Sequence, residues 1–129
     1  MYKLTAALLL AQALASPVDL EGRQSSCPNV HVFGARETTA PAGYGTSSVV
    51  VNLVLQAYPG STSEAINYPA CGGQSSCGGV SYANSVVQGV SAIASAINTY
   101  NKNCPNTQLV VVGYSQVCWT LPRCHVKNC

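Results

Sequence analysis

The chain has 129 residues, of which 47% are hydrophobic and only 8% charged, with a formal net charge of +2. Such a composition excludes a disordered segment and a charged coiled coil, since soluble domains carry about 25% charged residues. Six basic residues are too few to form an electrostatic binding surface for a phosphate backbone, so no nucleic-acid partner is expected. The length allows one modest domain.

The N-terminus has the features of a secretory signal peptide. Lys3 precedes an apolar run over residues 4–14, and small residues follow. We therefore interpret residues 1–15 as a signal peptide and residues 16–23 as a propeptide or tail. The apolar run is too short to cross a bilayer. The sequence predicts a secreted, extracellular protein without a membrane partner.

The first part of the chain predicts a strand and then a helix. Residues 29–33 alternate and are rich in β-branched residues, and the strand is expected to stop at Gly34. A helix is expected from Thr46, capped by Thr46 or Ser47 and ended by Pro59. Its predicted apolar face holds Val50, Leu53, Val54 and Ala57.

A second strand is predicted over residues 64–68, followed by a Gly-rich loop over residues 70–79. A long helix comes next and breaks at Cys104. Its predicted apolar face holds Tyr82, Val86, Val87, Val90, Ile93, Ala94, Ile97 and Tyr100. The apolar run over residues 109–112 is typical of a buried strand in a parallel sheet. The order β-α-β-α-β predicts an α/β fold with helices on both sides of a parallel sheet.

Seven cysteines in so short a chain indicate an oxidising compartment. Cys71 and Cys77 flank a tight loop and would most simply pair with each other, which leaves Cys27 to bridge Cys104. The chain-entropy relation gives about 4–5 kcal/mol for the longer bridge and about 2–3 kcal/mol for the shorter. Without a Cys-x-x-Cys pair or a histidine pair in this region, no metal and no cofactor are expected.

Directly after the last predicted strand stands Gly113-Tyr114-Ser115-Gln116. A serine on a sharp turn between a parallel strand and a helix is the nucleophile elbow of α/β-hydrolase-type enzymes, in which the next backbone N–H donates to the oxyanion. A plain surface turn is the competing interpretation of Gly-x-Ser. The pattern makes Ser115 the candidate nucleophile and Gln116 a candidate oxyanion donor.

Three longer strings carry a resemblance to a known family: HVFGARETTAPAGYG, YPGSTSEAINYPACGGQSSCGGVSY and LVVVGYSQ. They resemble the fungal acetylxylan esterases of the cutinase-like serine esterases, over residues 26–116. The resemblance implies a three-layer α/β/α sandwich that removes acetyl groups from xylan by a Ser-His-Asp mechanism. It assigns Ser115 as nucleophile, with Gln116 and Thr38 as oxyanion groups.

The resemblance is also consistent with the disulfides Cys27–Cys104 and Cys71–Cys77. It ends at Gln116, because Val117 stands where the family has glycine. We therefore divide the chain into a partial esterase domain over residues 24–116 and a tail outside the family over residues 117–129.

The tail holds three cysteines and the single tryptophan, and it has no periodicity. We interpret it as translated intron or out-of-frame sequence. A genuine divergent terminus with extra disulfides is the alternative. The pairing of its cysteines, Cys118, Cys124 and Cys129, stays open.

No residue matches the family's triad aspartate and histidine, which lie beyond Gln116. The histidines of this sequence are His31, in a predicted strand and best explained as structural, and His125, in the tail. Arg36 and Glu37 are expected to form a structural ion pair. Because an unassisted serine hydroxyl is a weak nucleophile, a polypeptide of these residues is expected to be inactive.

The sequence thus predicts a secreted serine esterase, monomeric if folded, whose substrate is acetylated xylan or a small ester. Two alternatives stay open. One is a cutinase or general short-acyl esterase, and the other is a non-catalytic, small, cysteine-rich secreted protein.

Overall fold

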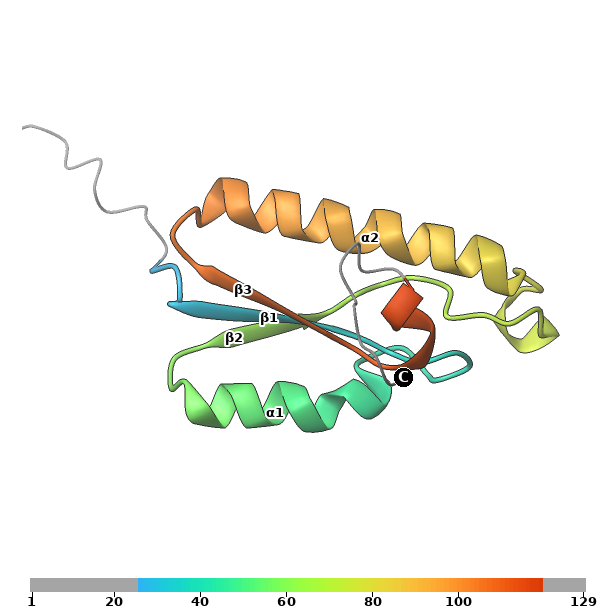
Figure 1. Ribbon diagram of the computed structural model, residues 1–129, viewed down its shortest axis with the longest axis horizontal. Coiled ribbons are helices and arrows are strands. Elements are labelled where there is room, and N and C mark those ends of the chain that lie inside the picture. Colours follow the sequence, from blue (N-terminus) through green and yellow to red (C-terminus); the bar gives the residue numbers. More distant parts are fainter. Residues whose placement is uncertain (1–25, 120–129) are drawn as a thin grey trace, which may run out of the picture.

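A computed structural model describes residues 26–119 (Figure 1). The chain forms a parallel sheet with the strand order β2-β1-β3, and each crossover carries one helix. The β-α-β-α-β order and the parallel sheet predicted from the sequence are confirmed. The elements are β1 (Val30–Ala35), η2 (Gly45–Ser47), α1 (Ser48–Ala57), β2 (Thr62–Ala65), η3 (Ser75–Cys77), α2 (Tyr82–Asn103), β3 (Gln108–Gly113) and η4 (Ser115–Trp119).

The two helices cover opposite faces of the sheet, so the molecule has three layers (Figure 1). The central strand β1 is buried along its whole length. Because successive side chains point to opposite faces, Val32 packs with Val51 of α1, whereas Phe33 packs with Ile93 of α2. The three-layer sandwich implied by the resemblance is confirmed.

Strand β1 continues through Gly34 to Ala35, two residues beyond the predicted end. Gly34 pairs with Ala65 and Val112 inside the sheet. A β-carbon at position 34 would lie 2.4 Å from Cδ1 of Tyr44. This glycine does not end the strand, because its missing side chain makes room for Tyr44.

Strand β2 covers Thr62–Ala65, whereas residues 64–68 were predicted. Thr62 already pairs with His31, and the backbone N–H of Ile66 makes a last bond to Gly34. Beyond this point the chain turns away, and the Tyr68 hydroxyl donates to the carbonyl of Arg36. The apolar residues 66 and 68 are therefore buried in the α2 core outside the strand.

The face that helix α1 buries overlaps the predicted one only at Val54. Val51 is buried and Val54 and Leu55 pack beside it, while Val50 and Leu53 are 46% and 58% exposed. The helix reads SVVVNLVLQA, with apolar residues almost all the way round. Periodicity therefore could not fix which side faces the sheet.

Helix α2 begins at the cap residue Ser81, whose hydroxyl accepts the backbone N–H of Asn84 at 3.2 Å. The prediction of its apolar face is right near the C-terminus, where Ile97 packs on the core, and wrong near the N-terminus, where Val87 is 63% exposed. The buried positions are Ser85, Gly89 and Ile93. Small residues let the helix approach the sheet closely. Within residues 26–119 no helix is long and apolar enough to cross a membrane.

Two disulfides hold the connections outside the sheet. Cys27, just before β1, is bonded to Cys104, at the end of α2. Cys71 is bonded to Cys77 within the loop between β2 and α2. These are the two pairs expected from the sequence.

Candidate active site

The sequence-predicted site residues lie where the chain leaves the carboxyl ends of β1 and β3. In the parallel register Ala35 lies opposite Gly113. The segments that follow these two residues, one with Thr38 and the other with Ser115, therefore leave the same edge of the sheet side by side. In open α/β sheets this edge is where ligands bind.

Ser115 occupies a backbone conformation that side chains rarely adopt. Its φ is 61°, and its side chain is exposed. It follows β3 by two residues and is the first residue of the short 3-10 helix η4. The chain therefore turns abruptly from strand to helix at Ser115, as the sequence predicts. In a nucleophile elbow such a turn exposes the serine hydroxyl at the sheet edge.

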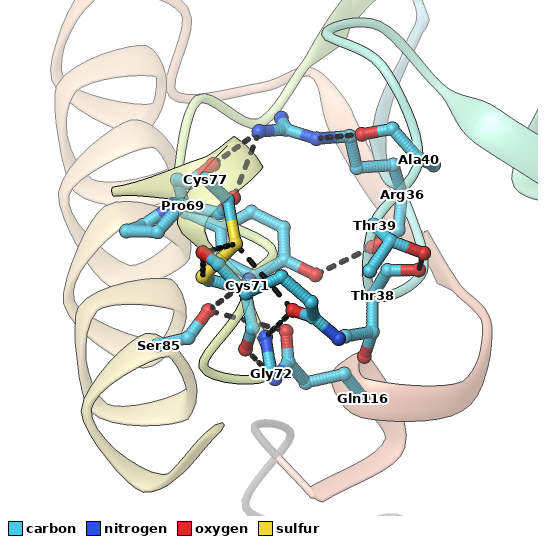
Figure 2. The surroundings of a disulfide bond; sticks show 12 residues. Arg36, Thr38, Thr39, Ala40, Pro69, Cys71, Gly72, Cys77, Ser85 and Gln116 are labelled. Atoms are coloured by element: carbon cyan, nitrogen blue, oxygen red, sulfur yellow. Dashed lines mark hydrogen bonds between the residues drawn. A yellow bond between two sulfur atoms is a disulfide. The ribbon is translucent and has the colours of Figure 1, made fainter. Parts of the chain in front are cut away.

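Gln116 is fully buried, and its side chain is held at both ends (Figure 2). The amide nitrogen Nε2 donates to the carbonyl of Cys71 at 3.2 Å, and the amide oxygen Oε1 accepts from the Ser85 hydroxyl at 3.2 Å. The residue that follows the candidate nucleophile is thereby fixed to the disulfide loop and to α2.

The loop that carries Thr38 contacts the same segment. The backbone N–H of Thr39 donates to the carbonyl of Ala70 at 2.7 Å. A β-carbon built on Gly72 would lie 3.2 Å from Cγ2 of Thr38, which places the Thr38 side chain against this glycine. Thr38 and Gln116 thus contact the adjacent residues Gly72 and Cys71, so the structure gathers Ser115, Gln116 and Thr38 at one edge.

Arg36 and Glu37 each stabilise the loop that follows β1, and they do so through different hydrogen bonds. The Arg36 side chain donates to the carbonyls of Ala40, Tyr68 and Pro69, and its guanidinium lies 5.3 Å from the Tyr68 ring centroid. Burial raises the pKa of Tyr68 to about 12, against the opposing charge of Arg36. The carbonyl contacts join the loop after β1 to the segment after β2.

The Glu37 carboxylate accepts the backbone N–H and the hydroxyl of Thr46, both at 2.8 Å. The backbone hydrogen bond from Thr46 is the main cause that lowers the pKa of Glu37. The expected Arg36–Glu37 ion pair is wrong, because the two side chains bind different partners. Ser47 is the N-cap residue of α1, one of the two expected, but it makes no side-chain cap hydrogen bond, because its hydroxyl donates to the carbonyl of Tyr44.

His31 is a structural residue, as expected for a histidine within a strand. It lies near the amino end of β1, away from the edge that carries Ser115. Its Nδ1 lies 2.7 Å from the Thr62 hydroxyl, its ring stacks on Tyr100 at 3.9 Å between centroids, and its Nε2 lies 3.9 Å from Oε2 of Glu64. Burial lowers the pKa of His31. The other histidine, His125, lies outside the described residues.

Ser85 was missed by the sequence analysis, because a serine within an amphipathic helix has no distinguishing pattern. Its spacing from Gly89 places two small residues on one face of α2, but this spacing alone does not indicate hydrogen bonds to distant segments. Within residues 26–119 no three His, Cys, Asp or Glu side chains gather as a metal site would require.

Val117 is buried in the core shared with α2. A β-carbon at Gly113 would lie 2.3 Å from its Cγ1, so the turn at Ser115 brings these two residues into close contact. The proposal that residues 117–129 form a tail outside the family stays a prediction.

Comparison with known proteins identifies the family to which the chain belongs. The family model described as Cutinase matches residues 26–122, whereas the resemblance taken from the sequence ends at Gln116. The chain is 66% identical over 112 residues to Cutinase 11 of Verticillium dahliae, covering 87% of this chain and 38% of that protein. It is 65% identical over 111 residues to Acetylxylan esterase 2 of Talaromyces purpureogenus, covering 86% and 47%.

Solved structures agree with this assignment. An acetylxylan esterase superposes with a TM-score of 0.69 at 72% identity, covering 70% of this chain and 44% of the other. The catalytic core domain of acetyl xylan esterase from Trichoderma reesei gives a TM-score of 0.71 at 68% identity, covering 73% and 46%. The chain spans less than half the length of each of these relatives. The family model over residues 26–122 and the fold shared with these structures agree: the chain belongs to the cutinase family.

Proposed function

We propose that the chain is the nucleophile-bearing part of a secreted serine carboxylic-ester hydrolase that removes acetyl groups from xylan. The observation that carries this proposal is Ser115, exposed at a φ of 61° directly beyond a parallel strand and beside the loop of Thr38. Relatives named acetylxylan esterase support the reaction and the substrate class. Two disulfides support secretion, because such bonds persist in oxidising compartments.

In the proposed reaction the Ser115 hydroxyl oxygen attacks the acetyl carbonyl carbon. The bond from that carbon to the sugar oxygen breaks, the sugar oxygen takes up a proton, and water later cleaves the acetyl-serine to acetate. The backbone N–H of Gln116 and a donor group of Thr38 would stabilise the oxyanion. Such donors contribute about 3–4 kcal/mol each where they have been removed by mutation.

A base must accept the Ser115 proton, and none of the described residues is placed to do so. His31 lies toward the opposite end of the sheet, and the Glu37 carboxylate is bound to Thr46. We propose that a polypeptide of these 129 residues binds esters at the oxyanion site but hydrolyses them no faster than its Ser115→Ala variant. Turnover well above that variant, measured with 4-nitrophenyl acetate, would contradict this part of the proposal.

Phosphonylation tests the proposed nucleophile without requiring turnover. A fluorophosphonate forms a bond from phosphorus to the serine oxygen, fluoride leaves, and the hydroxyl proton passes to water. No described base activates Ser115, so the selectivity would come from the proposed oxyanion donors, which would stabilise the charge that develops on the phosphoryl oxygen. We therefore expect mass spectrometry to map the adduct to Ser115 in preference to Ser95, an exposed serine on α2 that serves as an internal control. Equal labelling of the two serines would overturn the assignment of Ser115.

Cutinase is the second candidate activity, favoured by the matching family model and by the 66% identity to Cutinase 11. The two activities differ in the acyl chain that the site accepts. For the acetylxylan type we expect a methyl fluorophosphonate to label Ser115 faster than a dodecyl analogue. Faster labelling by the long-chain reagent would favour the cutinase activity.

A further inference from the structure

Three buried residues at the candidate site form a closed ring of hydrogen bonds (Figure 2). The Ser85 hydroxyl accepts the backbone N–H of Cys71 at 2.9 Å and donates to Oε1 of Gln116 at 3.2 Å. Nε2 of Gln116 then donates to the carbonyl of Cys71 at 3.2 Å and closes the ring. All three residues are fully buried, so water cannot replace a lost partner.

The ring fixes which way the Gln116 amide points. The oxygen faces a hydroxyl that has already accepted from Cys71 and therefore has its proton free to donate, while the nitrogen faces a carbonyl. Since Gln116 directly follows Ser115, anchoring its side chain also anchors the backbone N–H beside the candidate nucleophile.

The same segment supports the other proposed oxyanion group. Ala70, next to Cys71, accepts the backbone N–H of Thr39, and Gly72 lies against the Thr38 side chain. Cys71 is in turn bonded to Cys77. The loop after β1 and the turn after β3 are therefore attached to one short segment, which Ser85 ties to α2.

We propose that Ser85 is a positioning residue that sets the relative placement of the Thr38 and Gln116 oxyanion donors through Cys71. This inference rests on the proposed function, because the donors matter only if Ser115 is acylated. Ser85 itself is fully buried, so it would act through Cys71 and Gln116 and not on the substrate.

The Ser85→Ala variant of the full chain tests the proposal, with Ser95→Ala on the exposed side of α2 as the matched control. We expect the amide of Thr39 to exchange about tenfold faster in Ser85→Ala, because the segment that carries its acceptor loses an anchor. We expect fluorophosphonate labelling of Ser115 to slow by about 10- to 100-fold. Ser95→Ala should change neither rate.

A second variant keeps the test decisive if Ser85→Ala fails to fold. In Gln116→Glu an ionised carboxylate accepts from Ser85 but cannot donate to Cys71. Protection of the Thr39 amide should therefore fall at neutral pH and return when acid protonates the introduced carboxyl. Labelling of Ser115, measured relative to the unmodified chain at the same pH, should recover together with this protection. A purely structural role would restore the protection without restoring the labelling rate.

The outcomes separate this inference from the function on which it rests. Unchanged exchange and unchanged labelling in Ser85→Ala, or no acid recovery in Gln116→Glu, would overturn the positioning role alone. If Ser115 of the unmodified chain is labelled no faster than Ser95, the proposed function fails and the catalytic meaning of the ring fails with it.

Discussion

Three residues other than glycine hold positive φ angles among residues 26–119: Thr39 at 69°, Ala70 at 51° and Ser115 at 61°. All three lie on the segments that meet at the candidate site, and Thr39 donates directly to Ala70. Such conformations cost about 1–2 kcal/mol each and persist only where the surrounding contacts impose them. Their grouping at one sheet edge is an independent sign that this edge is functional.

The strain at Ser115 can be measured with two variants that both lack its hydroxyl. Ser115→Gly should be more stable than Ser115→Ala by about 1 kcal/mol, because glycine adopts positive φ without a steric penalty. Urea denaturation of both proteins gives this difference. Equal stability, or a more stable alanine variant, would mean that the turn does not impose its φ on residue 115.

His31 should make the protein less stable in acid. Burial lowers its pKa in the folded state below the ordinary 6.5, with the Glu64 carboxylate opposing the shift. Below pH 6.5 the unfolded chain therefore binds more protons, so the free energy of unfolding falls as the pH drops through the folded-state pKa. Thr62 and Tyr100 are the other polar groups that face the ring.

Chemical denaturation between about pH 7 and pH 5 measures this dependence. His31→Phe should flatten it, because the variant has no imidazole to protonate. Glu64→Gln should extend it to lower pH, because the charge that favours the protonated imidazole is gone. An unchanged slope in His31→Phe would refute the assignment to His31.

Sequence patterns predicted Ser115 and Gln116 as site residues from a local turn, and the family resemblance added Thr38. They could not find Ser85, whose importance comes from contacts with Cys71 and Gln116, 14 and 31 residues away. Buried hydrogen bonds between distant segments depend on tertiary placement, which no local pattern encodes.

The five main helices and strands were identified in order, since their apolar periods differ and glycine, proline and cysteine separate them. Which helix face is buried was harder to predict. Val49, Val50 and Leu53 of α1 are exposed, and the sheet side of α2 begins with Ser85 and Gly89. Where a helix is apolar all round, or where small residues allow close packing, hydrophobic period alone points to the wrong side.

The junction of β3 with η4 gives a prediction at this scale. Gly113→Ala should destabilise the protein by about 1–3 kcal/mol, because the added methyl group would overlap Val117. In a Val117→Gly background the same substitution should cost less than about 1 kcal/mol, since the clashing side chain is absent. A double-mutant cycle by urea denaturation measures the coupling, and additive effects would contradict the close contact.

At the scale of the whole molecule, two disulfide bonds stabilise the three-stranded sheet and its two helices, and they close loops of very different length. Cys27–Cys104 spans 77 residues and ties the start of β1 to the end of α2, whereas Cys71–Cys77 spans 6. The pairing could be predicted because four cysteines flank predicted elements in a simple nested order.

Loss of the long bridge should therefore cost more than loss of the short one. Replacing Cys27 and Cys104 by alanine should lower the free energy of unfolding by about 4 kcal/mol, against about 2 kcal/mol for Cys71 and Cys77. Thermal and chemical denaturation of the two double variants provide the comparison. A larger loss from the short bridge would show that local packing outweighs chain entropy.

The central claim is that the loop with Thr38 and the turn after β3 meet at Ser115. NMR of the chain, recorded before and after phosphonylation of Ser115 alone, tests this claim most directly. Because the adduct oxygen would lie between the proposed donors, the backbone amide signals of Gln116 and Thr38 should both shift, and those of α1 should stay in place. An adduct on Ser115 that leaves the Thr38 signal unmoved would contradict the assembled site.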